Sequence, residues 1–253
     1  MVKEELIQRS PVRIFMNSIN GGLKSGELGL IASPSGIGKT SVLVQIALDK
    51  LLQDKKVIHV SFTQNTNHVL AWYEDIFDEF IKKKNLENEE EVKNNLTKNR
   101  VLMKFSQAGI SSDQIQRSMR ALIKSGGFSA EVIIIDGFDF STSEEGHFAA
   151  IKSFASEMGV YCWYSCNVNS DLRSVDLRSV DLRSGNKPLS DQFYDQKNIP
   201  LVLKDNASLF DVIIVLEPKS DHIALTVSRD RDIYNPEHLA LKLDPKTLLI
   251  LEN

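Results

Sequence analysis

Residues 28–48 read LGLIASPSGIGKTSVLVQIAL. An apolar run at 28–32 is followed by a turn that contains two glycines and then by the apolar spacing of a helix. A strand that turns sharply into a helix N-terminus leaves several backbone N–H groups pointing at one spot, where the helix dipole also favours negative charge. The segment therefore predicts a phosphate-binding loop.

The loop meets the pattern G-x-x-x-x-G-K-[ST] at every position except the first, which is Ser33. Serine is small enough for such a turn, although it prefers a negative φ. Lys39 is expected to reach the outer phosphates of a nucleotide, and the Thr40 hydroxyl to bind its Mg²⁺. The residues predicted to hold the nucleotide are Ser33, Pro34, Ser35, Gly36, Ile37, Gly38, Lys39, Thr40 and Ser41.

The composition is that of one large globular domain. Of the 253 residues, 42% are hydrophobic and 25% are charged, which is ordinary for a soluble protein. No apolar run approaches the roughly 20 residues that span a bilayer, and the N-terminus has no signal-peptide pattern. We expect a cytoplasmic protein with no membrane partner. The net charge of −4 argues against nucleic-acid binding by bulk electrostatics, but leaves open a ring in which each subunit offers a few basic loop residues.

Strand and helix patterns alternate along the rest of the chain. Apolar or β-branched runs predict strands at 56–62, 101–105, 131–136, 160–165, 211–216 and 222–227, and a closing hairpin at 239–251. Helical spacing predicts helices at 67–80, capped by Asn67, and at 112–125, closed by Gly126 and Gly127. Residues 82–100, dense in Lys, Asn and Glu, predict a solvated helical insertion or an exposed hairpin.

This alternation predicts an α/β fold whose twisted, mostly parallel sheet is flanked by helices and ends in a C-terminal antiparallel hairpin edge. Cys162 and Cys166 lie four residues apart on one predicted strand, too far apart for a disulfide. We expect both to be buried thiols.

The second chemical motif is residues 131–136, which read EVIIID. Four apolar residues that end in an acid predict a buried central strand that delivers a carboxylate to the carboxyl edge of the sheet, where ligands of open α/β folds bind. Asp136 is therefore predicted to hold the Mg²⁺ shell opposite Thr40.

A resemblance adds to these motifs. Residues 17–28 read NSINGGLKSGEL and run directly into the loop. This block resembles the entry to the RecA-like P-loop ATPases, and within them the DnaB-type replicative helicase motors and the KaiC/RadA-like proteins, which have a GGL-x-x-GEL turn there. The resemblance implies a RecA-like ATPase domain over 15–253 after an N-terminal extension at 1–14. It also implies ATP and Mg²⁺ bound at a subunit interface, and commonly a hexameric ring.

One position departs from that family pattern. The strand after the phosphate-loop helix ends in S-[LF]-E in those families, whereas this chain has Ser61-Phe62-Thr63-Gln64-Asn65. Gln64 could orient a water without acting as a base, and Asp139 is a possible substitute carboxylate. Because loss of a catalytic base costs roughly 10²–10⁴-fold, we expect hydrolysis to be slow or absent.

Near the C-terminus, residues 228–232 read SRDRD. By resemblance to the K-x-R pair of DnaB-type motors, Arg229 matches the lysine, and Arg231 matches the arginine finger that reaches a neighbouring subunit's γ-phosphate. The alternative is a surface stretch that pairs with itself.

Residues 171–184 repeat the unit DLRSV, a five-residue period that fits neither helix nor strand. We expect a mobile loop at 170–190. It is either a segment with no specific partner or, through the arginines of 170–187, a contact for single-stranded DNA. Two functions follow: an ATP-binding protein with weak or absent hydrolysis that oligomerises around nucleotide, or an active DNA-dependent motor.

Overall fold

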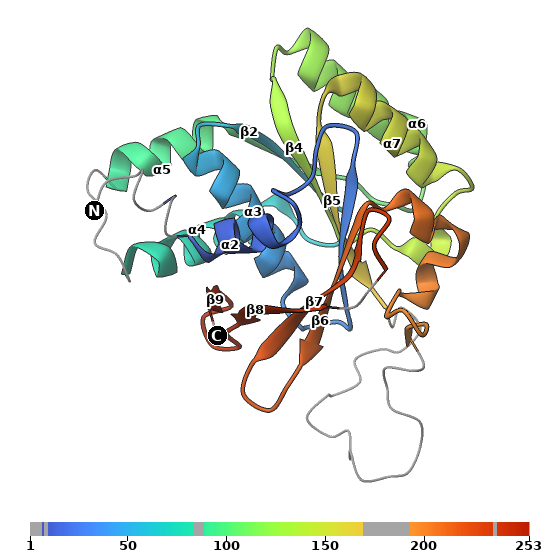
Figure 1. The fold of residues 1–253 in the computed structure, drawn as a ribbon. Helices are drawn as coiled ribbons and strands as arrows, with labels where there is room; N and C mark the ends of the chain where they lie inside the picture. The colour runs from blue at the N-terminus through green and yellow to red at the C-terminus, as the bar shows by residue number, and fades with distance from the viewer. Residues whose placement is uncertain (1–6, 8–9, 83–88, 169–192, 235–236, 253) are drawn as a thin grey trace.

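A mixed β-sheet forms the centre of the computed structural model, which describes residues 7, 10–82, 89–168, 193–234 and 237–252 (Figure 1). In the described part of the chain the strand order is β3-β2-β4-β5-β1-β6-β7-β8-β9. The strands are β1 (Leu28–Ser33), β2 (Lys56–Ser61), β3 (Arg100–Lys104), β4 (Ala130–Asp136), β5 (Tyr161–Asn167), β6 (Val212–Pro218), β7 (Ile223–Asp230), β8 (Glu237–Leu243) and β9 (Ile250–Glu252).

The sheet changes character along this order. The six neighbouring strands β3, β2, β4, β5, β1 and β6 pair in parallel. From β6 onward, through β7 and β8 to β9, the pairs are antiparallel. The chain is thus an α/β protein with a mostly parallel sheet flanked by helices and an antiparallel C-terminal region. That level of the predicted fold class is confirmed.

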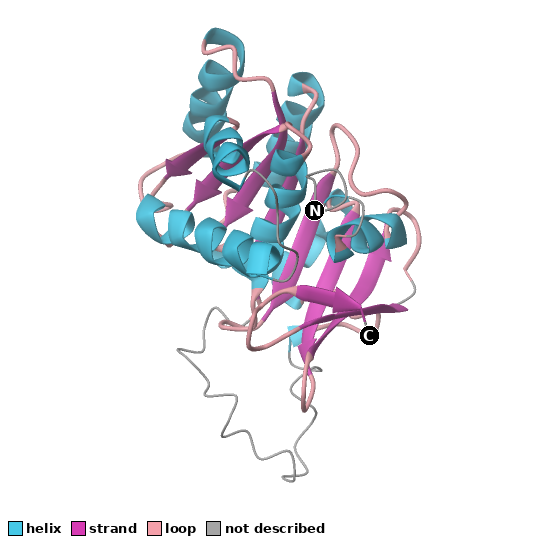
Figure 2. Cartoon of the chain, turned by 90° about the vertical axis from the view of Figure 1, so that its left-hand side faces the viewer, coloured by secondary structure: helices cyan, strands magenta, loops and turns pink. Residues whose placement is uncertain are grey.

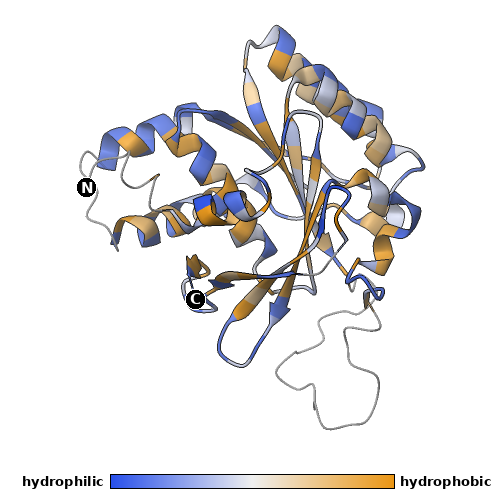
Figure 3. Cartoon of the chain, viewed as in Figure 1, coloured by the Kyte–Doolittle hydropathy of each residue, from blue (hydrophilic) through white to orange (hydrophobic). Residues whose placement is uncertain are grey.

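Helices cover both faces of the sheet, as the two views show (Figures 1 and 2). The helices are α2 (Pro11–Ser18), α3 (Lys39–Leu52), α4 (Thr66–Lys82), α5 (Glu89–Lys98), α6 (Ser112–Arg120) and α7 (His147–Met158), with short helical segments at Ala121–Ser125, Phe140–Thr142 and Leu201–Leu209. Helices α2 to α5 share one hydrophobic core with the sheet, and α6 and α7 share the other. The apolar residues concentrate in the strands between these layers, whereas α5 is largely hydrophilic (Figure 3).

Predicted and observed elements differ by a few residues at several ends, and for α4 and the closing hairpin the cause is clear. Helix α4 begins at Thr66, and Asn65 rather than Asn67 caps it, because the Asn65 side chain accepts a hydrogen bond from the His68 N–H at 3.0 Å. The described residues of the 82–100 stretch include the helix α5. The closing hairpin is shorter than predicted, because Leu248 has a left-handed φ of 56° and β9 starts only at Ile250.

Three further features bear on the predictions. Helix α2 spans the expected boundary at residue 15, and Val12 and Phe15 are both fully buried in the core. Cys162 and Cys166 are buried and free, as predicted, on the strand between β4 and β1. Burial raises the pKa of each thiol to about 12. No helix in the described ranges is long and apolar enough to cross a bilayer.

Candidate functional site

The loop between β1 and α3 has the conformation of a phosphate-binding turn. Ser33 is the last residue of β1 and stays extended in the sheet, so the position at which the pattern asks for glycine does not require a positive φ here. The left-handed positions are Gly36 (φ 82°) and Gly38 (φ 105°), which glycine adopts without strain. A Cβ on Gly38 would also lie 2.6 Å from Leu243 Cδ2, so any other residue there would require the Leu243 side chain to shift.

Lys39 folds back over this loop. Its ammonium donates hydrogen bonds to the Ser33 carbonyl at 2.9 Å, the Ser33 hydroxyl at 3.2 Å and the Pro34 carbonyl at 2.7 Å. Burial lowers the pKa of Lys39 to about 8, because a desolvated ammonium is less stable in its charged form. All three acceptors are neutral oxygens, and a phosphate oxygen would be a stronger acceptor for the same charge.

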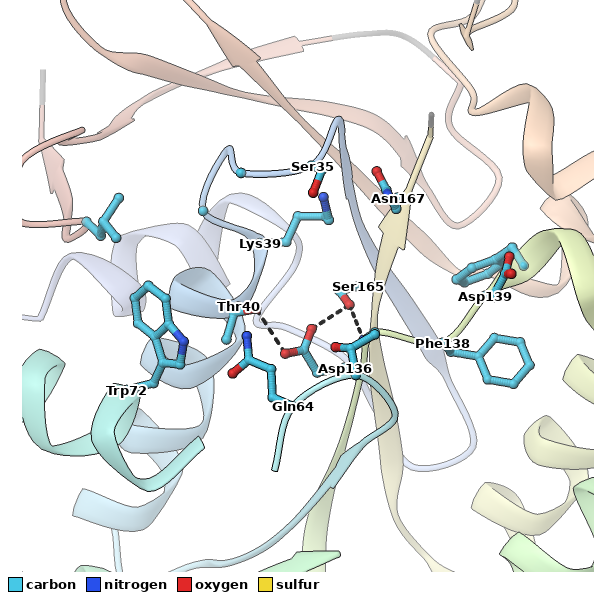
Figure 4. A pocket seen from close by; sticks show the side chains of 16 residues that line it. Ser35, Lys39, Thr40, Gln64, Trp72, Asp136, Phe138, Asp139, Ser165 and Asn167 are labelled. Atoms are coloured by element: carbon cyan, nitrogen blue, oxygen red, sulfur yellow. Dashed lines mark hydrogen bonds between the residues drawn. The ribbon is translucent and has the colours of Figure 1, made fainter. Parts of the chain in front are cut away.

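The Asp136 carboxylate joins three strand and helix ends beside the loop (Figure 4). One of its oxygens accepts from the Thr40 hydroxyl at 2.9 Å, and the other from the Ser165 hydroxyl at 2.6 Å. The Ser165 oxygen in turn accepts from the Gly137 N–H at 2.8 Å. The predicted pair of Mg²⁺ ligands, Thr40 and Asp136, is thus brought together.

These two oxygens fit the way proteins hold Mg²⁺. Magnesium is usually bound through one or two protein oxygens together with waters and substrate phosphates, not by an all-protein cage. In the part of the chain that the structure describes, no group of three His, Cys, Asp or Glu side chains could hold a metal.

A cleft of about 470 Å³ opens over the loop. Besides loop residues, Asp136 and Ser165, it is lined by Thr63, Gln64, Trp72, Gly137, Phe138, Asp139, Phe140, Asn167 and Leu248. The predicted residues Gln64 and Asp139 therefore share one cavity with the loop. Gln64 Oε1 and Asn167 Oδ1 are buried, and neither has a hydrogen-bond partner among the described residues.

One oxygen of the Asp139 carboxylate is engaged within the chain. Its Oδ1 accepts hydrogen bonds from the Ser141 N–H at 2.9 Å and the Ser141 hydroxyl at 2.6 Å, which starts the short helix at 140–142. The Gln107 side-chain amide fixes the Asp139 backbone with two hydrogen bonds of 2.7 Å. The carboxylate thus has a structural task at the cleft wall.

The predicted arginine pair lies away from this cleft. Arg231 donates to both carboxylate oxygens of Glu27, at 3.1 and 2.8 Å, to the Gly22 carbonyl at 2.8 Å and to the Ile19 carbonyl at 3.3 Å, and it also pairs with Asp230. Glu27 immediately precedes β1, whereas the loop follows β1, so Arg231 sits at the opposite end of that strand.

Arg229 is also engaged within the chain. It donates to the Arg231 carbonyl at 2.7 Å and to the Ala207 carbonyl at 2.6 Å, and its guanidinium lies 4.8 Å from the Tyr234 ring centre. The structure thus gives both arginines contacts that hold the fold together. A role toward a neighbouring subunit stays a prediction.

Several cleft residues were missed from the sequence, among them Ser165, Asn167, Trp72 and Leu248. Ser165 and Asn167 end β5, whose register places them beside Ile31 and Ser33 of β1. Polar residues at the end of an otherwise apolar strand could have identified these two, because carboxyl ends of neighbouring parallel strands meet at one edge. Trp72 and Leu248 gave no such signal. The loop at 170–190, with its possible DNA contacts at 170–187, lies outside the described residues.

A scan against protein-family models finds no family that matches the chain, and a search of curated proteins finds no match.

Proposed function

We propose that this chain is a RecA-like P-loop protein that binds ATP with Mg²⁺ and hydrolyses it slowly or not at all. The observation that carries the proposal is the contact between the Thr40 hydroxyl and the Asp136 carboxylate at 2.9 Å, beside a glycine turn over which Lys39 is folded. A hydroxyl, a carboxylate and an ammonium around backbone N–H groups match the charges of a magnesium triphosphate.

Each residue has a distinct task in binding. The Lys39 ammonium would exchange its carbonyl partners for phosphate oxygens, which gain more from its charge. Thr40 and Asp136 would hold the Mg²⁺, and Ser165 keeps the Asp136 carboxylate oriented through its 2.6 Å hydrogen bond. When bound, the Mg²⁺ supplies positive charge to the phosphate oxygens.

The same cleft supports slow turnover. Thr63 stands where the resembling families carry glutamate, and one oxygen of the Asp139 carboxylate is bonded to Ser141. Gln64 can orient a water, but an amide cannot remove its proton. Without a base, hydrolysis is expected to be roughly 10²–10⁴-fold slower than with one.

The sheet supports the RecA-like part of the proposal. The loop follows a central parallel strand, and the antiparallel region beside it is the edge that RecA-like sheets carry. A nucleotide at the interface between copies of this chain, within a ring, belongs to the same proposal.

Isothermal titration calorimetry with a non-hydrolysable ATP analogue and Mg²⁺ tests the binding. Lys39→Ala removes a charged donor worth about 1.5–3 kcal/mol, so affinity should fall by roughly tenfold or more. Lys98→Ala, which removes an exposed lysine at the end of α5, is the matched control and should bind like the wild type. Equal affinity of the Lys39→Ala and wild-type proteins would refute the site.

A further inference from the structure

We propose that Ser33 is a positioning residue whose hydroxyl holds the Lys39 ammonium on the loop in the free protein and thereby lowers the affinity for nucleotide. Ser33 is the position at which the loop departs from its sequence pattern, which has glycine there. The inference rests on the proposed function, because it concerns how the lysine is released to a phosphate.

The backbone at Ser33 and Pro34 is well fixed. A residue before proline is restricted to extended conformations, and Ser33 is accordingly the last residue of β1. The Ser33 carbonyl also accepts a hydrogen bond from the Val168 N–H at 3.2 Å, which joins it to the end of β5. Both residues are buried. The oxygens of Ser33 and Pro34 therefore have little freedom to move.

The Ser33 hydroxyl is oriented to accept from Lys39. It donates its own proton to the Pro34 carbonyl at 2.9 Å, which leaves its lone pairs for another donor. Lys39 Nζ lies 3.2 Å from this hydroxyl oxygen, 2.9 Å from the Ser33 carbonyl oxygen and 2.7 Å from the Pro34 carbonyl oxygen. A glycine at position 33 would keep both carbonyls and lose the hydroxyl. The third acceptor therefore depends on the serine.

These three contacts use the whole hydrogen-bonding capacity of Lys39. An ammonium group has three N–H donors, and the two carbonyls and the hydroxyl accept one each. A phosphate oxygen can therefore bond Lys39 only after one contact is given up, and the hydroxyl contact is the longest of the three. The hydroxyl thus stabilises the free protein more than the nucleotide-bound protein.

Ser33→Ala tests this, because it removes the hydroxyl and keeps the Cβ. Calorimetric titration with a non-hydrolysable ATP analogue and Mg²⁺ should show an affinity roughly 3- to 10-fold higher than that of the wild type, which is the effect of one hydrogen bond. The melting temperature of the free variant should fall, since the ammonium loses an acceptor. A residue that only packed the loop would lower affinity and stability together.

Two further variants isolate the contact between the hydroxyl and the ammonium. Ser33→Thr keeps a hydroxyl and should bind the analogue like the wild type. In a Lys39→Ala background, Ser33→Ala should leave the affinity unchanged, because no ammonium remains for the hydroxyl to hold. Ser153→Ala, at an exposed serine of α7, is the matched control and should bind like the wild type.

The outcomes distinguish the two proposals. If the wild type does not bind the analogue, the proposed function itself fails. If it binds, and Ser33→Ala binds equally or more weakly, the hydroxyl does not restrain Lys39 and the phosphate site stands. A gain in affinity that persists in the Lys39→Ala background would also overturn the inference, since the hydroxyl would then act on another group.

Discussion

Thr63 is the residue on which the expected slow hydrolysis depends most directly. It ends the segment Ser61-Phe62-Thr63 at the position of a glutamate in the resembling families, and it lines the cleft. Thr63→Glu should therefore supply a base for the attacking water and raise turnover by roughly 10² fold or more. Phosphate release at saturating Mg·ATP measures this change.

Thr63→Gln is the matched control, because glutamine has nearly the size of glutamate but carries no removable charge. It should turn over ATP at the wild-type rate. A wild-type rate in the Glu variant, or a wild type already as fast as an active motor, would contradict the missing-base explanation.

Lys39 makes nucleotide binding sensitive to pH. Because burial lowers its pKa to about 8 in the free protein, the ammonium loses its proton as the pH rises through 8, and with it the attraction for phosphate. The affinity for ATP should then fall by an amount approaching roughly tenfold per pH unit above 8. Titrations at pH 7, 8 and 9 measure the slope, which Lys39→Ala should lack.

The lowered pKa of Lys39 affects the stability of the free protein in the opposite direction. Between pH 8 and 10.5 the unfolded chain binds more protons at Lys39 than the folded chain does, so the free protein should gain stability as the pH rises through that window. Below pH 8 the cost of burying the charge is present in full.

At the scale of elements, Arg231, which directly follows β7, binds the turn at residues 19–27 that precedes β1. Arg231→Ala leaves the Gly22 and Ile19 carbonyls and the Glu27 carboxylate without their donor, and should lower the free energy of unfolding by about 1–3 kcal/mol. Glu27→Gln should also destabilise. Urea denaturation of the single and double variants should show a double loss smaller than the sum.

That non-additivity is the discriminating result. An arginine that served only a neighbouring subunit's nucleotide would leave the stability of the isolated chain unchanged, and its effect would be independent of Glu27.

Gln45 fixes the closing hairpin to α3. Gln45→Leu fills the same space but leaves the buried Ile250 N–H and the Leu248 carbonyl without this partner, at a cost of about 1–3 kcal/mol for each group left unsatisfied. A clear drop in melting temperature is expected. Gln196→Leu, at an exposed glutamine, should stay within about 0.5 kcal/mol of wild type, so equal melting of both variants would contradict the role of Gln45.

The elements that the sequence predicted well are those with local signals. The β1 strand, the glycine turn and α3 follow from one continuous pattern, and β4 from its apolar run before Asp136. The cap depended on which of two nearby asparagines, Asn65 or Asn67, accepts the hydrogen bond, and the short β9 on the left-handed backbone at Leu248. Trp72 and Leu248 reach the cleft only through packing of α4 and the hairpin on α3, which no spacing in the sequence records.

At the scale of the whole molecule, a ring would give the protein a larger molecular mass in solution when nucleotide is bound. If the nucleotide binds between copies, Mg·ATP should convert the protein into a larger species, and slow hydrolysis should let that species persist. Light scattering after size-exclusion chromatography, with and without Mg·ATP, measures this. Lys39→Ala should not assemble, and a wild type that binds ATP as a monomer would contradict the ring.

Ligand binding should also stabilise the whole fold. A ligand at 100 times its Kd adds about 2.7 kcal/mol to the stability of the native state. This shift does not depend on assembly, so it separates a protein that binds without oligomerising from one that does not bind.

The two buried cysteines of β5 can report on opening of the protein's core. Both sulfurs are fully buried and the pKa of each thiol is raised to about 12. Ellman's reagent should therefore react very slowly with the native protein. Labelling must wait until the core between the sheet and helices α6 and α7, in which both cysteines lie, opens to solvent. The rate at which colour develops would thus measure how often this core opens, with no dye or tag introduced.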